Sequence, residues 1–598
     1  MSKYFSPFVI PFCIGVVLLF AICIWKYIRW YKGFDRLQRA IIRKNILSWK
    51  FLPAIWEIIM ESLLHRRIFK RNLILGYMHA SIAFGWFLLI VVGFFEAELG
   101  IHGSKPFWVA IFYRFFQHEH NTFPSAAVFT QVMDGLLLFV LSGIAIAFVK
   151  MIYSRIVGMK KVTKHVIFDR FAKVSLWCIF PFRLLSESVT AAMYHNGGFL
   201  TQTIGNMLPF ANEYVEYTCW LLYSLALGVF FTAMPFSRYM HIFTEVFLIF
   251  FRRLGVKEDE QKSGYTKYEL SACSRCGICI DACPLNKQLD IKGVQSVYFL
   301  RDIRYKMLKD EIADNCLMCS RCASDCPVQI DLMAIRRQMR DKKELDTRNN
   351  YRYLDTVHAF NAMDRVVYFA GCMSHLTPGI PEAMEKIFEA VDQKYWYMDK
   401  EATICCGRPL MQQGFHTQAA ELRRKNTRLI VQSHATMLVT SCPICYQSFT
   451  KEYKLPIKVM HHTEYIDMLI KSGKLKPSKD TSLKVTYHDP CELGRGCGIY
   501  DEPRDVLNSV AVLMKTPEER EHSLCCGFNL GNTVIELEQQ EKIRNAALEN
   551  LQTGNPDLIC TACPMCKKAF TRATEAKVMD IAELVSNQIK NQELRTKI

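Results

Sequence analysis

The sequence predicts a multidomain protein that joins an all-α bundle of five transmembrane helices to a small α-helical domain and a duplicated α/β domain. Three observations predict this organisation: five long apolar stretches before residue 253, a doubled run of four cysteines, and a doubled pattern of five cysteines further on. The expected boundaries are 1–252 for the membrane domain, 253–355 for the small helical domain, and 356–478 and 479–598 for the two α/β modules.

The composition excludes a disordered or fibrous chain, because 51% of the 598 residues are hydrophobic. The formal net charge of +17 is concentrated in the apolar part: residues 1–253 carry 26 Lys and Arg against 12 Asp and Glu, whereas residues 254–598 carry 48 against 45. A soluble nucleic-acid binder would carry its basic excess on a folded domain with a recognition motif, and the sequence has no such motif. We therefore expect a membrane partner and no nucleic acid.

Each apolar stretch is long enough to cross a bilayer, which needs about 20 helical residues. Only Lys3 precedes the first stretch, and Lys26, Arg29 and Lys32 follow it, which favours an anchor with its amino end outside over a cleaved signal peptide. The stretches are Phe8–Ile24, Leu73–Phe95, Ala127–Val149, Phe171–Tyr194 and Val215–Phe250, and the last is long enough to leave the membrane at its cytoplasmic end.

The loops between these stretches alternate in charge. Residues 26–73 carry 12 Lys and Arg and residues 150–173 carry 7, whereas residues 96–126 carry 2 and residues 195–214 carry none. The positive-inside rule places the two basic loops, and everything after Arg253, in the cytoplasm. The sequence thus predicts a multi-pass protein of the cell's inner (cytoplasmic) membrane with cytoplasmic cysteine-rich domains.

Two histidines lie at a similar depth in the predicted membrane helices. His79 in the second span and His241 near the end of the fifth are both on the cytoplasmic side. Two imidazoles facing each other across a helical bundle are the ligands of a six-coordinate haem b, and the alternative is two interfacial histidines without metal. Arg183 and Glu187, at i,i+4 spacing in the fourth span, are expected to pair. Arg183 then either holds a haem propionate or forms a structural ion pair.

The segments around these histidines resemble a known family. Gly76–Phe87 and Met234–Phe243 are similar to spans two and five of the cytochrome b subunit of respiratory nitrate reductase and of membrane heterodisulfide reductase. The resemblance implies that His79 and His241 bind the haem nearer the cytoplasm. The nitrate reductase subunit has a second haem pair, whose positions fall near Leu89 and Tyr223. Neither Leu89 nor Tyr223 can serve as a ligand of that haem, so one haem b is expected unless His195 or another residue substitutes.

A second feature is a run of the form Cys-x2-Cys-x2-Cys-x3-Cys-Pro that occurs twice with an offset of 43 residues. This is the bacterial two-cluster ferredoxin run, in which three close cysteines bind one cluster and the fourth reaches the other. The intervening Val294–Asp314 is helical in pattern, which resembles the helical ferredoxin domain of quinone-linked dehydrogenases. Zinc tolerates the spacing, but the doubled run with both prolines favours iron–sulfur. The expected 4Fe–4S ligand sets are Cys273, Cys276, Cys279 and Cys326, and Cys316, Cys319, Cys322 and Cys283.

A third feature is a five-cysteine pattern that repeats at offsets of 119 to 121 residues, which indicates an internal duplication. Each copy offers one thiolate more than a cubane cluster uses, and a disulfide framework is implausible in the cytoplasm. Short β-rich runs precede the cysteines and helical runs, Thr417–His434 and Asn532–Gln552, lie between them, so the ligands follow strands of an α/β fold. The copies are Cys372, Cys405, Cys406, Cys442 and Cys445, and Cys491, Cys525, Cys526, Cys563 and Cys566.

These motifs, with His488–Gly496 and Ile499–Leu507, resemble the CCG modules of heterodisulfide reductase, and the whole chain resembles a fusion of that enzyme's membrane cytochrome and its catalytic iron–sulfur protein. The resemblance implies that each five-cysteine set binds a noncubane 4Fe–4S cluster and that a disulfide is cleaved between them. Phe528–Gly531 departs from the family's glycine-rich stretch, which changes the pocket beside the cluster. Cys497 and Cys560 fall outside the motif and are expected to be buried thiols.

The sequence has no dinucleotide fingerprint, no Walker lysine loop and no c-type haem motif, so two-electron chemistry would occur at metal clusters. We expect an oxidoreductase that passes electrons between quinone, haem b and the clusters to a small-molecule or protein disulfide, with other redox subunits as candidate partners. The alternative is a relay from a partner flavin dehydrogenase of the glycolate, lactate or glycerol 3-phosphate type. The ten cysteines favour catalysis, and His488 either supplies a proton or caps the loop before Cys491.

Overall fold

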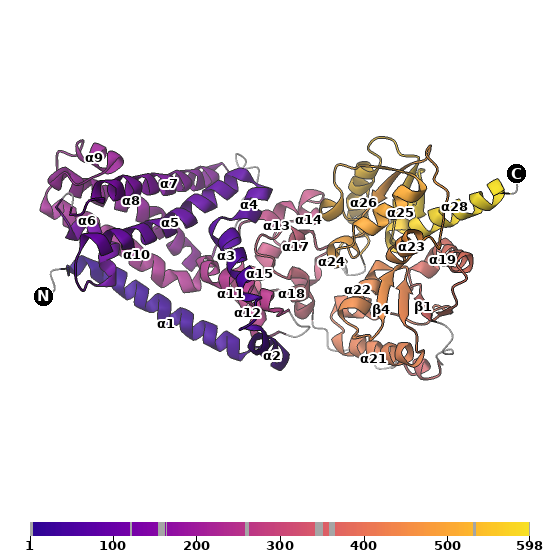
Figure 1. Cartoon of the computed structure of the whole chain (residues 1–598). Coiled ribbons are helices and arrows are strands. Elements are labelled where there is room, and N and C mark those ends of the chain that lie inside the picture. The colour runs from indigo at the N-terminus through magenta and orange to yellow at the C-terminus, as the bar shows by residue number, and fades with distance from the viewer. Residues whose placement is uncertain are drawn as a thin grey trace. The chain divides into compact units, whose positions relative to one another are not determined.

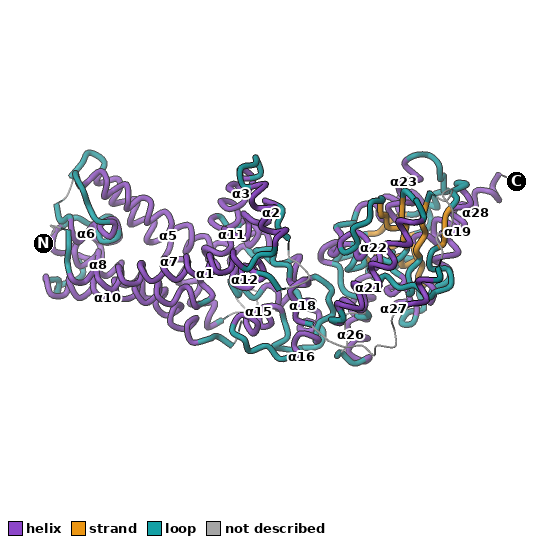
Figure 2. The backbone as a smooth tube through the Cα atoms, turned by 90° about the horizontal axis from the view of Figure 1, so that it is seen from below, coloured by secondary structure: helices purple, strands orange, loops and turns teal. Residues whose placement is uncertain are grey.

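The computed structural model describes residues 4–119, 122–153, 162, 164–257, 262–340, 351–357, 365–529 and 534–596. The chain divides into two compact units, Met1–Gly277 and Ile278–Ile598, which we call the amino-terminal and carboxyl-terminal units (Figure 1). Strands occur in the carboxyl-terminal unit, whereas the described part of the amino-terminal unit contains only helices, turns and loops (Figure 2).

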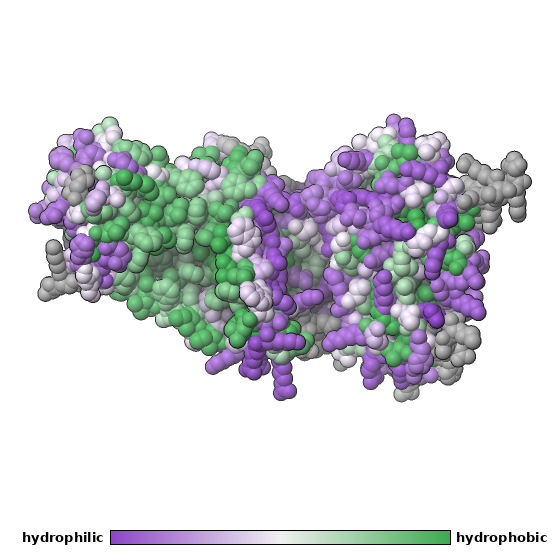
Figure 3. Space-filling view, in the orientation of Figure 1, coloured by the Kyte–Doolittle hydropathy of each residue, from purple (hydrophilic) through white to green (hydrophobic). Residues whose placement is uncertain are grey.

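Five long helices build the amino-terminal unit, and they pack as neighbours in the order α1, α10, α8, α7 and α5. On the face that Figure 3 shows, the middle of this bundle has a largely hydrophobic surface. The long helices are α1 (Ile10–Lys32), α5 (Leu73–Gly100), α7 (Ala126–Ile152), α8 (Ile167–Tyr194) and α10 (Glu213–Ala233). The short ones are α2 (Arg36–Asn45), α3 (Phe51–Ile58), α4 (Arg66–Arg71), α6 (Tyr113–Phe116), α9 (Phe199–Gly205), α11 (His241–Leu254) and α12 (Gly264–Ala272).

Glycine allows two of these helices to approach closely. A Cβ added to Gly15 of α1 would lie 2.7 Å from the Cα of Gly228 in α10, so neither position has room for a side chain. Around this contact, Phe8 and Phe12 pack with Trp220 and Phe230 in a buried core. Close backbone approach at small residues is a general way of packing helices in membranes.

The five-span prediction is confirmed only in part. Four helical segments of the described chain are long and apolar enough to cross a membrane: Pro7–Lys32, Leu73–Gly100, Ala126–Ile152 and Glu213–Phe236. The fourth predicted span is helical, as α8, but charged side chains such as Arg183 and Glu187 lower its apolar character. The fifth does not continue to Phe250, because the chain leaves the helix in 3-10 turns around Pro235 before α11 begins.

The first part of the carboxyl-terminal unit is α-helical. The segment Val294–Asp314, expected to be helical from its residue pattern, contains α15 and α16. The helices are α13 (Ile278–Asp281), α14 (Pro284–Lys287), α15 (Ser296–Arg304), α16 (Asp310–Asp314), α17 (Arg321–Ser324) and α18 (Leu332–Met339).

Two four-stranded parallel sheets follow, in the orders β2-β1-β3-β4 and β6-β5-β7-β8. All four β-rich runs expected before the cysteines are central strands. The strands are β1 (Val366–Phe369), β2 (Tyr395–Tyr397), β3 (Met437–Thr440), β4 (Lys458–His461), β5 (Lys484–His488), β6 (Val512–Met514), β7 (Leu558–Thr561) and β8 (Lys577–Asp580). The duplication seen in the cysteines therefore extends to the fold.

One apolar core is shared by the two modules, since it includes Tyr368 of β1, Tyr487 of β5 and buried residues of the helices between them. The predicted helical runs are found as α21 and α26. The helices of the modules are α19 (Gly379–Ala390), α20 (Arg408–Gln413), α21 (His416–Gln432), α22 (Pro443–Lys451), α23 (His462–Lys471), α24 (Gly494–Cys497), α25 (Asp501–Val510), α26 (Leu537–Leu551), α27 (Pro564–Thr571) and α28 (Ile581–Thr596).

Candidate metal centres

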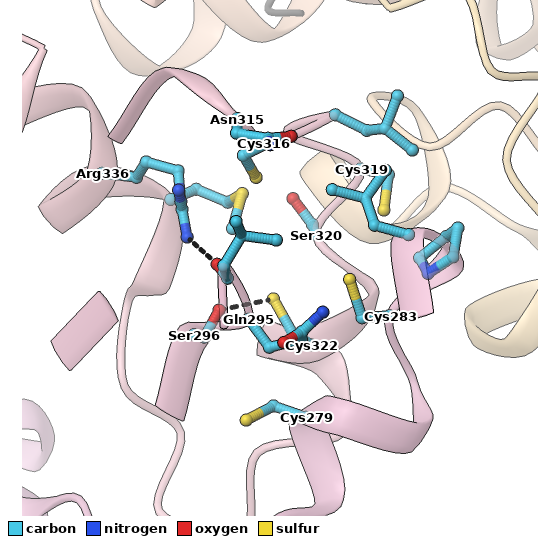
Figure 4. A pocket seen from close by; sticks show the side chains of 15 residues that line it. Cys279, Cys283, Gln295, Ser296, Asn315, Cys316, Cys319, Ser320, Cys322 and Arg336 are labelled. Atoms are coloured by element: carbon cyan, nitrogen blue, oxygen red, sulfur yellow. Dashed lines mark hydrogen bonds between the residues drawn. The ribbon is translucent and has the colours of Figure 1, made fainter. Parts of the chain in front are cut away.

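One cavity of the carboxyl-terminal unit is lined by five cysteines of the doubled run. Cys283, Cys316, Cys319 and Cys322 place their sulfurs around the cavity, whereas Cys279 lies to one side with its sulfur turned away (Figure 4). Short helices make this arrangement possible, because Cys283 precedes Pro284 at the start of α14 and Cys322 lies in α17. The structure thus brings together the four cysteines that the spacing groups in one set.

Hydrogen-bond donors point at these sulfurs. The Ser296 hydroxyl lies 3.2 Å from the Cys322 sulfur, and the Met318 backbone N–H lies 3.3 Å from the Cys316 sulfur. Burial, with the nearby Cys316 thiolate, raises the pKa of Cys322 to about 12. Thiolates gathered in this way need a positive partner, so the cavity fits a bound metal centre with sulfur-directed hydrogen bonds, such as a 4Fe–4S cluster.

The other cysteines of the doubled run divide between the units. Cys273 and Cys276 belong to the amino-terminal unit, and Cys279 and Cys326 belong to the carboxyl-terminal unit. Their grouping as one ligand set stays a prediction.

The first module gathers its five cysteines from three loops at the carboxyl edge of its sheet. Cys372 follows β1, Cys442 follows β3, and Cys445 lies in the first turn of α22. Cys405 and Cys406 come from the loop before α20. Neighbouring side chains touch in the order Cys372, Cys405, Cys406, Cys445 and Cys442.

Two glycines make this convergence possible. Gly371 adopts φ +92°, and a Cβ there would lie 2.8 Å from the Cβ of Cys442 and 3.1 Å from the Cys445 sulfur. Gly407 adopts φ +81° and directs its N–H to the Cys405 sulfur at 3.4 Å. Both positions need the left-handed backbone that glycine adopts without strain.

The second module repeats the arrangement. Cys491 follows β5, Cys563 follows β7, and Cys566 lies in α27. Cys525 and Cys526 come from the segment between β6 and α26. The sulfurs of Cys526 and Cys566 are 3.4 Å apart, and Cys525 contacts both Cys491 and Cys526. Five sulfurs therefore converge in each copy, which fits a centre that uses more thiolates than a cubane cluster.

The two sets are neighbours. Cys442 of the first set acts electrostatically on Cys563 of the second. Buried polar side chains join the loops that carry the sets: the Gln412 amide donates to Glu492 at 2.9 Å, and the Arg408 guanidinium lies 3.6 Å from the same carboxylate. The Arg408–Glu492 pair thus links the residue directly after Cys406-Gly407 to the residue directly after Cys491.

His488 lies at the end of β5 and is 3% exposed, with its ring edge against Phe570 at 4.8 Å between centroids. Burial lowers its pKa, so the imidazole is neutral near pH 7 and lacks the extra proton of a general acid. The loop before Cys491 is held by Asp489 instead, which accepts from Arg504 and from the Arg520 N–H.

The remaining residues singled out in the sequence lie near the second set. Asn529 donates to Glu492 at 3.3 Å and lies 3.7 Å from the Cys491 sulfur, while Leu530 and Gly531 lie outside the described residues. Cys560 is fully buried in the shared core, as expected, whereas Cys497 is partly exposed.

In the amino-terminal unit, His79 of α5 has a neighbour that sequence reasoning missed. The His65 ring stacks on His79 with centroids 5.6 Å apart, and the His65 Nδ1 contacts the Leu63 carbonyl at 2.9 Å. His241 contacts the Arg238 carbonyl through Nδ1 at 2.8 Å and lies close enough to act electrostatically on His79. A ligating histidine commonly has its second nitrogen bonded in this way, so His241 fits an axial ligand.

Arg183 pairs with Glu187 inside α8, with Nε and Oε1 2.9 Å apart and both side chains buried. The contact accounts for a charge at this depth without a haem propionate. The expected pairing of Arg183 with Glu187 is thus present, and a role of Arg183 toward a haem propionate stays a prediction.

Two further residues beside the clusters have only a weak signal in the sequence. Arg495 lies four residues after Cys491, where the first copy has Leu376 four residues after Cys372. Glu492 likewise follows Cys491 where Met373 follows Cys372. A charge at one copy of a duplicated motif, with an apolar residue at the other, is the signal that could have identified them.

Comparison with protein families agrees with these two kinds of site. Residues 366–450 and 485–571 match the cysteine-rich domain called CCG, and residues 269–330 match a 4Fe–4S dicluster domain. The matched segments contain both five-cysteine sets and the doubled run.

Comparison with curated proteins gives oxidoreductases. EtfAB:quinone oxidoreductase of Syntrophomonas wolfei is 22% identical over 96% of this chain and 95% of its own length. One chain of the dihydromethanophenazine:CoB–CoM heterodisulfide reductase of Methanosarcina barkeri is 24% identical over 54% of this chain and 94% of its own. One chain of the CoM/CoB fumarate reductase of Methanothermobacter marburgensis is 25% identical over 55% and 75%. The chain is thus a relative of iron–sulfur oxidoreductases that carries two CCG domains, a 4Fe–4S dicluster domain and apolar helices long enough to span a membrane.

Proposed function

We propose that the chain is a membrane-bound oxidoreductase that carries electrons between a flavoprotein partner and quinone. The observation that carries the proposal is the similarity to EtfAB:quinone oxidoreductase, because it extends over nearly the whole of both chains and so includes the apolar unit. The similarity to the heterodisulfide reductase covers about half of this chain.

The cysteines would hold the electron carriers. In the dicluster domain, Cys283, Cys316, Cys319 and Cys322 would hold one 4Fe–4S cluster, and Cys273, Cys276, Cys279 and Cys326 the other. Each five-cysteine set would hold a noncubane cluster. Such clusters supply stepwise electron transfer, and the chain's own residues bury them and direct N–H and O–H donors at their sulfurs.

The membrane unit would carry a haem b between His79 and His241. The Arg238 carbonyl contacts Nδ1 of the His241 ring, and Nε2 is the atom that would bind the haem iron. His79→Ala and His241→Ala should each remove the same b-type absorbance, and the exposed His102, as His102→Ala, is the matched control. A full reduced haem spectrum in both variants would contradict the assignment and make His65 the next candidate. The proposal includes a quinone-binding site in the chain and a cytoplasmic location for the clusters.

A second candidate is disulfide reduction, which the cysteine sets favour. Ten thiolates converge in two neighbouring sets with buried polar groups between them, and a simple relay has no need of the second set. Cleaving a disulfide to two thiols takes two electrons and two protons. The neutral, buried His488 is a poor source of those protons.

One experiment separates the two candidates. The purified full chain in detergent is given a short-chain quinone and a reduced electron-transferring flavoprotein, or a reduced quinol and a disulfide. We expect quinone reduction with the flavoprotein and its loss in Cys526→Ala, with Cys497→Ser as the control thiol. Disulfide reduction by quinol without any flavoprotein, together with no flavoprotein activity, would overturn the relay in favour of the second candidate.

A further inference from the structure

The dicluster domain and the second CCG module meet at a pair of cysteines. Cys319 and Cys525 contact each other through their side chains, and they are 7% and 2% exposed. Leu285, Leu317 and Ile543 pack around them in one small apolar cluster. A predicted ligand of a 4Fe–4S cluster therefore touches a predicted ligand of the second five-cysteine set.

Arg495 joins the two sides of this contact. Its Nε donates to the Cys319 carbonyl at 2.8 Å, and its Nη1 donates to the Ser523 carbonyl at 2.8 Å, two residues before Cys525. Nη1 also lies 3.3 Å from the Glu521 carbonyl. One guanidinium thus holds the backbone of both cysteine loops.

The third guanidinium nitrogen of Arg495, Nη2, donates to no backbone carbonyl among the described residues. Nη2 is buried, and among the described residues no acceptor lies within hydrogen-bond distance. Burial lowers the pKa of Arg495, but the Cys319, Cys491 and Cys525 thiolates raise it overall, so the group is cationic. A buried, unpaired donor of a charged group is costly, and sulfur is the acceptor that these three cysteines provide.

The duplication shows that this cation is not part of the general module. The matching position of the first copy is Leu376, which is 56% exposed. Hydrogen bonds and positive charge at the sulfurs make an iron–sulfur cluster easier to reduce. The two five-cysteine sets therefore differ at this point in a property that fixes reduction potential.

We propose that Arg495 is a positioning residue that directs Nη2 to a sulfur of the cluster held by the second set and raises that cluster's reduction potential. Cys319 and Cys525 then form a junction through which electrons pass between the dicluster domain and the second set. The inference deepens the proposed function, since it rests on the cysteine sets holding clusters.

The test is a mediated potentiometric titration of the purified full chain, followed by EPR. The signal of the second set is identified by its absence in Cys526→Ala. In Arg495→Leu, which copies the first module, we expect that signal to shift to lower potential, with a smaller downward shift of the cluster held by Cys319 and no shift of the first set. Arg495→Lys keeps the charge but loses the planar guanidinium with its several N–H donors, so we expect a smaller downward shift of the potential. Arg520→Leu, an exposed arginine of the same module paired with Asp501, is the control and should shift nothing.

Iron content decides how the result is interpreted. If Arg495→Leu keeps its iron and all potentials are unchanged, or if all centres shift equally, the proposal is overturned. If Arg495→Leu loses iron, Arg495→Lys decides, and an unchanged potential in that variant overturns it. Chemical mediators deliver the electrons, so failure of the flavoprotein or disulfide reaction would leave this measurement unaffected.

Discussion

Removal of the Arg504 charge should loosen the strand that leads to Cys491. Arg504 forms a two-pronged pair with Asp489, with N–O distances of 2.6 and 2.8 Å, and the two side chains are 10% and 2% exposed. Arg504→Met keeps much of the aliphatic packing but leaves the Asp489 carboxylate buried with the Arg520 N–H at 2.8 Å as its remaining partner. We expect the second set to lose iron as the loop opens.

The magnitude follows from the burial of the pair. Two charges about 4 Å apart attract by about 4 kcal/mol at an effective dielectric constant of about 20. Removing one partner of a buried pair costs about 3–5 kcal/mol. The retained backbone hydrogen bond places this case near the lower end, at about 3 kcal/mol, which corresponds to roughly a hundredfold change in a local opening equilibrium.

Hydrogen exchange read by mass spectrometry measures this opening in the full chain. Peptides that cover β5 should exchange about a hundredfold faster in Arg504→Met, since local opening governs their protection. Asp489→Asn combined with Arg504→Met removes the uncompensated charge and should recover part of the protection. Exchange within twofold of the wild type in the single variant would refute the reasoning, because the pair would then contribute nothing to holding β5.

Two further predictions concern the first module. Gly371→Ala should abolish iron binding by the first set alone, because φ at this position is +92° and the new Cβ would lie 2.8 Å from the Cβ of Cys442. Gly473→Ala is the control, because φ there is +71° but among the described residues no atom lies within 4 Å of the added Cβ. The iron content of the control should match the wild type. The Asp399 carboxylate lies 3.4 Å from His375 and raises the pKa of that histidine, so the pair stabilises the fold fully below the unfolded pKa of about 6.5 and loses this effect as pH rises through the folded pKa. His375→Gln should therefore flatten the dependence of melting temperature on pH between 6 and 8. An unchanged slope would count against this prediction.

Much of the fold could be predicted from local sequence. The runs before Cys372, Cys442, Cys491 and Cys563 are β-branched and apolar, and each forms a central parallel strand. The offsets of 119 to 121 residues predicted that the copies share a fold, and the matching strand orders of the two sheets agree. Local composition was sufficient because each strand is short, buried on both faces and closed by a ligand loop.

The amino-terminal unit was less predictable because spacing and hydropathy do not report side-chain pairing. Arg183 and Glu187 neutralise each other inside α8, so a helix that is polar by composition still packs within the bundle. The break at Pro235 divides a stretch that hydropathy alone treats as continuous. His65 directly precedes α4 in a left-handed backbone conformation that no periodicity marks, yet its ring stacks on His79.

The duplication explains why sequence reasoning found the cysteines but not their neighbours. A repeated pattern identifies what the copies share, whereas the chemistry of each set depends on where the copies differ. Glu492 and Arg495 stand beside Cys491, but Met373 and Leu376 stand beside Cys372, and these four lie at equal spacing from their cysteines. Arg495 and the contact with Cys319 therefore belong to the second set, whereas Arg408 is the buried cation beside the first set and reaches Glu492. If each set holds a cluster, this difference in charged neighbours should give the two clusters different reduction potentials, which the titration of Arg495→Leu measures.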